Sequence, residues 1–223
     1  MAKGRAAQQP DRIFLLSPAN CSGRRAAMVL SERAQFDLAL RLRSEAGAAL
    51  GDVFAFVSGL YFKGKLAYAL AFARPPDTAA ALAASGVLVI TPTAGLRPAE
   101  TPVTAGAIRA FAQVDIASGD PQYRRPLLAS AQALADDIGP ECDVVLLGSI
   151  ASAKYVEVLS EVFGARLRFP VDFVGRGDMS RGGLLLRAAR GGEELAYVTV
   201  AGAVRHGPRP PKLAPLPGIS KWR

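Results

Sequence analysis

The sequence predicts a single α/β domain, in which a mostly parallel or mixed sheet is flanked by helices and followed by a C-terminal β-hairpin and flexible basic tails. Apolar segments typical of buried strands alternate along the chain with segments whose apolar residues recur at helical spacing. Half of the 223 residues are hydrophobic and only 7% are aromatic, which indicates a core of packed aliphatic side chains. We expect the domain to span residues 13–202, between a basic N-terminus (1–12) and a proline-rich basic tail (203–223).

The first half of the chain contains three predicted strands and two predicted helices. The strands are Ile13–Leu16, Asp52–Ser58 and Val87–Thr91, and the helices are Phe62–Ala73 and Asp77–Ala84. The segment Pro92–Pro102 has three prolines and a glycine, so we interpret it as a loop.

The second half repeats the alternation with clearer boundaries. We expect a helix that opens at Pro126, a strand at Asp143–Leu147, a helix ended by Gly164, a half-buried strand at Arg166–Val174, and a hairpin of Leu184–Ala189 with Leu195–Val200.

The net charge of +8 is unevenly distributed along the chain. Residues 1–12 carry +2 and residues 201–223 carry +5, so the body is nearly neutral. The tail cations Arg205, Arg209 and Lys212 are therefore candidates for salt-sensitive contacts with DNA or RNA. A solubilising extension, or a general bias of composition, would explain the same residues.

Several residue types that catalysis commonly uses are scarce. The single histidine, His206, lies in the tail, so the body cannot supply a Ser-His-Asp or Cys-His pair. Two cysteines, Cys21 and Cys142, are too few for a zinc site of the usual kind, and no phosphate-binding loop motif is present. We expect no metal ion and no cofactor. No apolar run approaches the ~18 residues of a membrane span, so we expect a cytoplasmic protein without a membrane partner. The oligomeric state stays open.

The loop after the first predicted strand is the first candidate site. Asn20 and Ser22 are polar side chains that can bond a ligand, although they can also satisfy the loop's own backbone. Cys21 lies close to the consecutive arginines Arg24 and Arg25, which would favour a reactive thiolate. The favoured interpretation of Cys21 is a small buried side chain that fills space.

The glycine-rich segment Val174–Gly183 is the second candidate site. Arg176 and Arg181 could hold a phosphate or carboxylate, with Ser180 as a further hydrogen-bonding group. Asp178 could accept a hydrogen bond from a sugar or base, or act as a general base. The alternative is a turn in which the aspartate and arginines pair with each other.

Weaker signals surround two helix starts. The junction Gly148–Lys154 joins a strand to a helix, where free backbone N–H groups attract anions, but most α/β proteins have such junctions. Tyr61, Lys63 and Lys65 could make polar contacts, and a solvated helix face is the favoured explanation for them.

Two short motifs resemble those of the YaaA-like family. LLSPAN at Leu15–Asn20 resembles the opening strand and loop of that family, and VITPTAGLRP at Val89–Pro98 resembles a later element. The stretch LYFKGKLAYALAFA is similar to a helix of related bacterial proteins, some of which look akin to a domain of archaeosine synthase.

The resemblance implies a nucleic-acid or nucleobase context. YaaA-like proteins are associated with DNA binding and oxidative-stress protection, and archaeosine synthase modifies a deazaguanine base in transfer RNA. The residues to which the resemblance extends are Ser17, Pro18, Ala19, Asn20, Gly95, Leu96 and Pro98. The Lys-Pro-Tyr and His elements of archaeosine synthase have no equivalent, so its amidating chemistry is not implied.

The leading hypothesis is that the protein handles a nucleotide or nucleobase, within a nucleic acid or free. Its pocket would lie where the loops Ser17–Arg25, Thr91–Pro98 and Val174–Gly183 converge at the carboxyl edge of the sheet. Asp178 would be the base, and Arg176 with Arg181 would hold phosphate. A non-catalytic DNA- or RNA-binding protein and a small-metabolite enzyme are the alternatives.

Overall fold

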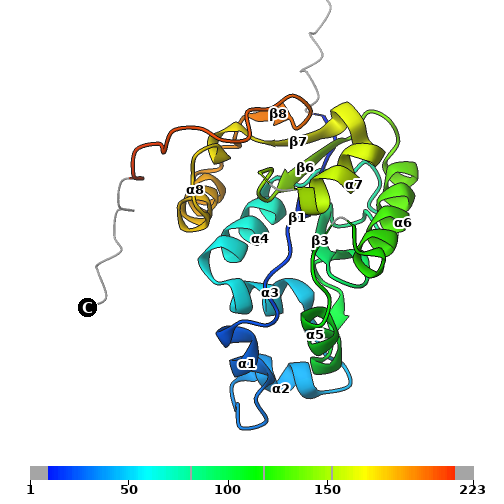
Figure 1. Cartoon of the computed structure of the whole chain (residues 1–223), viewed down its shortest axis with the longest axis vertical. Coiled ribbons are helices and arrows are strands. Elements are labelled where there is room, and N and C mark those ends of the chain that lie inside the picture. Colours follow the sequence, from blue (N-terminus) through cyan, green and yellow to red (C-terminus); the bar gives the residue numbers. More distant parts are fainter. Residues whose placement is uncertain (1–9, 81, 118, 152, 214–223) are drawn as a thin grey trace, which may run out of the picture.

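A six-stranded mixed sheet forms the centre of the molecule, with the strand order β4-β3-β1-β6-β7-β8 (Figure 1). The computed structural model describes residues 10–80, 82–117, 119–151 and 153–213. The strands of this sheet are β1 (Arg12–Leu16), β3 (Val87–Thr91), β4 (Gly95–Pro98), β6 (Asp143–Leu147), β7 (Leu167–Pro170) and β8 (Tyr197–Thr199). The strands β3, β1, β6 and β7 run parallel, and β4 and β8 pair antiparallel at the two edges. The predicted α/β class is confirmed.

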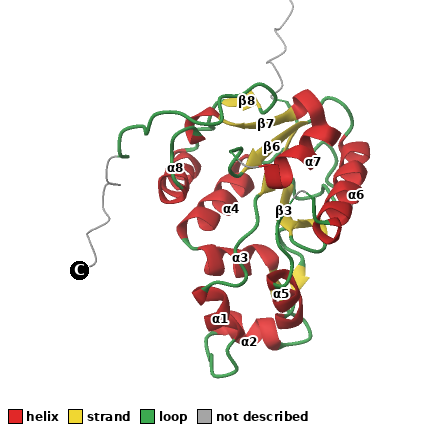
Figure 2. Ribbon diagram, in the orientation of Figure 1, coloured by secondary structure: helices red, strands yellow, loops and turns green. Residues whose placement is uncertain are grey.

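Helices cover both faces of the sheet (Figure 2). The helices of the described residues are α1 (Arg24–Leu30), α2 (Asp37–Arg43), α3 (Leu50–Ser58), α4 (Leu60–Phe72), α5 (Ala105–Ala112), α6 (Pro121–Ile138), α7 (Ala153–Phe163) and α8 (Asp178–Gly191). In the view of Figure 2, α1, α2, α3 and α5 lie below the sheet, and the others lie beside it. Two short 3-10 turns, η1 (Gly164–Arg166) and η2 (Val171–Phe173), flank β7. A separate small sheet pairs β2 (Ala48–Ala49) with β5 (Pro102–Val103). Within the described residues, no helix is long and apolar enough to cross a membrane.

The central strands are buried because their sequences are almost entirely apolar. Every residue of β1 and β3 is buried, and so are the last four of β6. Parallel strands that are covered on both faces have this composition. Phe14 of β1 lies opposite Val87 on one side and Val145 on the other.

The chain connections explain why helices lie on both faces of the sheet. The chain leaves β1 and crosses through α4 to β3, whereas it leaves β6 and crosses through α7 to β7 on the other side of β1. Crossovers of this kind are right-handed, so opposite directions along the sheet place α4 and α7 on opposite faces. In Figure 1, α4 and α8 lie on one side of the sheet, and α6 and α7 lie on the other.

Helices α4 and α8 pack together at two glycines. A Cβ on Gly64 would lie 2.6 Å from the carbonyl oxygen of Gly182, and a Cβ on Gly182 would lie 2.8 Å from the Cα of Tyr61. Neither position has room for a side chain. The close approach of these helices sets where the start of α8 stands relative to α4.

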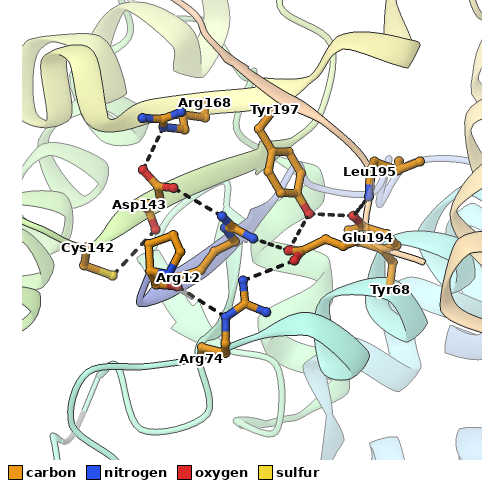
Figure 3. A network of polar contacts seen from close by, with 10 residues as sticks. Arg12, Tyr68, Arg74, Cys142, Asp143, Arg168, Glu194, Leu195 and Tyr197 are labelled. Atoms are coloured by element: carbon orange, nitrogen blue, oxygen red, sulfur yellow. Dashed lines mark hydrogen bonds and ion pairs between the residues drawn. The ribbon is translucent and has the colours of Figure 1, made fainter. Parts of the chain in front are cut away.

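A partly buried ionic network closes the amino-terminal end of β1 (Figure 3). Arg12 bonds Glu194 and Asp143, the latter at 3.3 Å, and its guanidinium lies 4.6 Å from the centre of the Tyr197 ring. Glu194 also accepts from Arg74 at 3.1 Å. The network joins β1, β6 and the segment before β8 at the edge of the sheet opposite to Ser17.

Two predicted strands are wrong. Asp52–Ser58 belongs to helix α3 and is not a strand. Its apolar residues are buried on several sides of the helix and follow no clear period, so the sequence pattern did not distinguish a helix from a strand. Leu184–Ala189 lies inside α8, so there is no C-terminal hairpin: β8 pairs with β7 instead. The glycines interpreted as its turn end the helix, where Gly192 has a φ of +67°.

Other boundaries differ in detail. The segment Pro92–Pro102 contains β4, which returns antiparallel to β3, and the helix expected from Pro126 begins earlier, at Pro121. Asp120 caps that helix by accepting from the Gln122 N–H at 2.8 Å. The described part of Asp77–Ala84 forms turns rather than a helix.

Candidate ligand pocket at the carboxyl edge of the sheet

A cavity of about 740 Å³ opens where the loops after β1 and β6 diverge toward opposite faces. Such a switch point at the carboxyl ends of parallel strands is where open α/β sheets bind ligands. We call this cavity the switch-point pocket. Its lining residues are Ser17–Ser22, Ser58, Tyr61, Lys65, Pro92, Phe111–Ile116, Ser149, Lys154, Tyr155 and Asp178.

A buried lysine and a serine meet on the inner wall of this pocket. Lys65 Nζ donates to the Ser17 carbonyl oxygen at 2.6 Å and to Ser17 Oγ at 2.8 Å. Lys65 is 1% exposed and Ser17 is 7% exposed. Ser17 occupies this place because it ends β1, and Lys65 reaches it from the face of α4 that packs on β1.

The surroundings of Lys65 favour its neutral form. Its Nζ lies 4.6 Å from the ring centres of both Tyr61 and Phe62. Burial lowers the pKa of Lys65 to about 7, and the negative charge of Asp178 opposes that fall. Among the described residues, Lys65 forms no ion pair with a carboxylate. A lysine of this kind can exchange a proton near neutral pH.

Tyr155 holds the loop after β6 against the end of β1. Its hydroxyl donates to the Ser149 carbonyl oxygen at 3.0 Å and accepts from the Ser149 N–H at 3.0 Å. Gly148 leaves the space for this contact, because a Cβ there would lie 2.8 Å from both the Tyr155 hydroxyl and the Ser17 Cβ. Burial raises the pKa of Tyr155, so its hydroxyl stays protonated.

Tyr61 supplies a further hydroxyl to the same wall. It is 8% exposed, and its Oη has no hydrogen bond of good geometry among the described residues. Burial raises the pKa of Tyr61, and the nearby Arg181 guanidinium opposes the rise. The Tyr61 hydroxyl is therefore a protonated group buried behind the pocket wall.

The loop after β1 is tied together by its own polar groups. Asn20 Oδ1 accepts from the Ser22 N–H at 3.0 Å and from Ser22 Oγ at 2.7 Å, and both residues are exposed at the pocket. Cys21 is 5% exposed, and burial raises its pKa to about 12. Its thiol is thus a buried, protonated group, as the favoured interpretation held.

The segment Val174–Gly183 contributes less to the pocket than the sequence indicated. Asp178 lines it, but its side chain is 70% exposed and lies 3.7 Å from Arg181. Arg181 donates to the Phe173 carbonyl oxygen at 3.0 Å, and Arg176 donates to that of Asp172 at 2.9 Å. The two arginines hold the η2 turn and do not converge on one point of the switch-point pocket.

Arg176 and Ser180 line a second cavity instead. This cavity, of about 350 Å³, lies between the start of α8 and the tail, and its lining includes Arg187, Arg209 and Lys212. We call it the basic cavity. Arg205 does not line it, and residues 214–223 lie outside the described part of the chain.

The structure therefore brings the loop after β1 into the pocket, with one residue from each of the other two expected loops. Ser17, Asn20 and Ser22 meet Asp178 there, and Pro92 represents the loop after β3. Gly95, Leu96 and Pro98 lie in β4, away from this lining. Ser152, which belongs to the junction Gly148–Lys154, is outside the described residues.

Lys65 and Tyr61 have a larger part in this pocket than their sequence pattern indicates. A solvated helix face is the wrong explanation for both, because they are buried, whereas Lys63 is exposed as that explanation requires. The signal was available in part: Tyr61, Lys65 and Tyr68 recur at intervals of about one or two helical turns, which places them on one face. Phe111–Ile116 gave no recognisable motif.

No family model, curated protein or solved structure matches the chain. The protein is an α/β protein with a mixed open sheet and a cavity at its switch point. Among the described residues, no group of three or more histidine, cysteine, aspartate or glutamate side chains is placed to hold a metal ion.

Proposed function

We propose that the switch-point pocket binds a nucleotide or nucleobase, presented within a nucleic acid or as a free molecule. The observation that carries the proposal is the pocket's position between the loops of β1 and β6, together with its volume of about 740 Å³. That volume suits a ligand of nucleotide size, since small-molecule sites span roughly 300–1,000 Å³.

The lining has the groups that such a ligand needs. Asn20, Ser22 and Ser149 carry polar groups suited to the edge of a base or to a sugar hydroxyl, and Tyr61 and Phe111 provide aromatic surface. Lys154 stands at the start of α7, where a cation and the helix N-terminus together favour a phosphate.

The basic cavity supports a polymer rather than a free nucleotide. It adjoins the switch-point pocket through the start of α8: Asp178 lines the pocket, and its neighbours Gly177 and Met179 line the cavity. The cations Arg176, Arg209 and Lys212 could then hold backbone phosphates while one base enters the pocket. The resemblance to YaaA-like proteins, which includes Ser17 and Asn20, supports the same context.

Two other functions have some support. The basic cavity alone would serve a non-catalytic DNA- or RNA-binding protein. The pocket itself carries two lysines and two aspartates, Lys65, Lys154, Asp115 and Asp178, and this balance would suit a small polar metabolite.

The proposal is tested by identifying what the protein binds. The purified protein is denatured and the released molecules are identified by mass spectrometry, and nucleosides and nucleoside monophosphates are titrated by calorimetry. Wild type should bind a base-containing ligand, and Asn20→Trp, which would fill the pocket, should lose most of that affinity. The exposed Arg97→Gln change on β4 is the control and should bind as wild type. Equal binding by wild type and Asn20→Trp would overturn the proposal.

A further inference from the structure

Ser17 and Lys65 are arranged as a nucleophile and its base. Ser17 Oγ lies 2.8 Å from Lys65 Nζ, and both residues line the switch-point pocket. A second Lys65 contact, to the Ser17 carbonyl oxygen at 2.6 Å, fixes the amine on the serine it would serve. Base activation of a serine by a lysine occurs in proteins that lack a catalytic histidine, and this body has none.

We propose that the protein catalyses acyl transfer, with Ser17 as the nucleophile and Lys65 as the general base toward a carboxylic ester or amide. This inference goes beyond the proposed binding function and holds whether or not the ligand contains a base. Burial of a lysine among aromatic rings without a paired carboxylate is costly, and a neutral amine avoids that cost.

The reaction proceeds in two balanced steps. In the first, Ser17 Oγ bonds to the carbonyl carbon and its proton passes to Lys65 Nζ. The bond to the leaving oxygen or nitrogen then breaks, and the leaving group takes that proton. In the second, water attacks the acyl carbon and gives a proton to Lys65, and Ser17 Oγ leaves and recovers its proton.

Tyr61 would stabilise the charge that develops on the carbonyl oxygen only if its side chain turned toward the pocket, because its hydroxyl oxygen has almost no exposed surface. Its hydroxyl is buried on the same wall, has no hydrogen bond of good geometry within the described chain, and remains protonated. Its ring lies against the Lys65 amine, 4.6 Å from Nζ, so the three side chains share one corner of the pocket.

The test uses a fluorophosphonate, which reacts with activated serines as Oγ bonds to phosphorus and fluoride leaves. Intact-protein and peptide mass spectrometry should show one label on Ser17 of wild type and none on Ser17→Ala. Lys65→Met should be labelled about a hundredfold more slowly, because it lacks the base. Lys63→Met removes an exposed lysine from the same helix, outside the pocket lining, and should label at the wild-type rate.

A pH profile of labelling separates a base from a structural lysine, and it needs only folded wild type. The rate should rise with pH and level off above an inflection near 7, where Lys65 loses its proton. Asp178 and Arg181 of α8, Tyr61 of α4, Tyr155 and Lys154 of α7 and Cys21 are the other charged or titratable groups around this corner. Asp178→Asn should move the inflection to lower pH, since Asp178 favours the charged lysine.

Two results would overturn the inference. One is folded wild type that gains no label on Ser17. The other is labelling of Ser17 that does not depend on Lys65. In that case the pH profile of the labelling rate has no inflection that Asp178→Asn shifts, or folded Lys65→Met is labelled as fast as wild type. If Ser17 is labelled but no nucleotide binds, the acyl-transfer inference stands and the proposed ligand class fails.

Discussion

At the scale of single residues, the most informative side chain is Lys65. A lysine buried to 1% exposure among aromatic rings is expensive to keep charged, so its presence requires a reason beyond packing. Its two hydrogen bonds to Ser17 supply such a reason. The same burial makes the stability of the protein depend on pH.

The folded-state pKa of Lys65, about 7, lies below its ordinary value of 10.5. Between these values the unfolded chain binds a proton that the folded chain does not, so this group makes the protein more stable as pH rises from 7 toward 10.5. Below pH 7 the folded state carries the full cost of the buried charge.

We therefore predict that Lys65→Met stabilises the protein most at low pH. Urea unfolding should show a larger gain in the free energy of unfolding at pH 6 than at pH 9, because Met removes a cost that wild type bears mainly below pH 7. The exposed change Lys63→Met should show no such trend. A gain that is equal at the two pH values would contradict the assignment of a lowered pKa to Lys65.

Glu194 is the residue on which the ionic network depends. It accepts from Arg12 and Arg74 and from the Tyr197 hydroxyl at 3.0 Å. Glu194→Gln leaves the buried guanidinium of Arg12 with Asp143 as its remaining carboxylate, so we predict a loss of about 3 kcal/mol in the free energy of unfolding. Chemical denaturation measures the loss. Glu193→Gln changes its exposed neighbour and should stay within about 0.5 kcal/mol of wild type.

At the scale of elements, the packing of α4 on α8 decides how the pocket is closed. Gly182 touches the backbone of α4, whereas a Cβ on the next residue, Gly183, would meet only Leu213 Cδ1 at 3.6 Å. Gly182 therefore has no room for a side chain, whereas its neighbour Gly183 in the same helix does. Asp178 reaches the pocket rim because α8 packs this closely on α4.

We predict opposite effects for the two alanine substitutions. Gly182→Ala should cost about 2 kcal/mol, because backbone atoms 2.8 Å away must move. Gly183→Ala should gain up to about 1 kcal/mol from its better helix propensity. Thermal and urea unfolding of the pair measure both. If Gly182→Ala proved as stable as Gly183→Ala, the close approach of the helices would be wrong.

The elements also show what the sequence could predict. The strands β1, β3 and β6 were predicted at nearly their observed bounds, because runs such as VLVIT have few alternatives in an α/β chain. The segment DVFAFVS was misassigned since a fully buried helix and a buried strand look alike over seven residues. The glycines after Arg190 could end a helix or turn a hairpin, and only the pairing of β7 with β8 decides between them.

The candidate site, like the fold, could be predicted from the sequence only in part. The loop after β1 was identifiable because a buried strand that ends in polar residues predicts a site at the sheet edge. Lys65 was not identifiable in this way, because a lysine on a helix faces solvent or the core depending on which face of that helix packs against β1. Long-range packing sets that face, and local pattern does not.

At the scale of the whole molecule, positive charge gathers beside the pocket instead of only in a separate tail. Arg209 and Lys212 of the tail join Arg176 of the body around the basic cavity. If nucleic acid crosses this cavity, these cations release counterions from its backbone on binding.

We predict that the double change Arg209→Gln, Lys212→Gln weakens binding to single-stranded DNA or RNA at low salt. The slope of log affinity against log salt concentration should fall by about 2, as expected for two lost phosphate contacts. Fluorescence anisotropy with a labelled oligonucleotide measures the slope. Changing the exposed arginines Arg97 and Arg109 in the same way is the charge-matched control. An unchanged slope would remove the basic cavity from the interface.

The account depends most on the claim that the switch-point pocket is the binding site. The most direct measurement is the mapping of amide chemical-shift changes in ¹⁵N-labelled protein titrated with nucleoside monophosphates. We predict that the changes concentrate at Ser17–Ser22, Phe111–Ile116 and Ser149 to Tyr155. Changes confined to the surroundings of Arg176 and Arg209, or none at millimolar ligand, would contradict the claim.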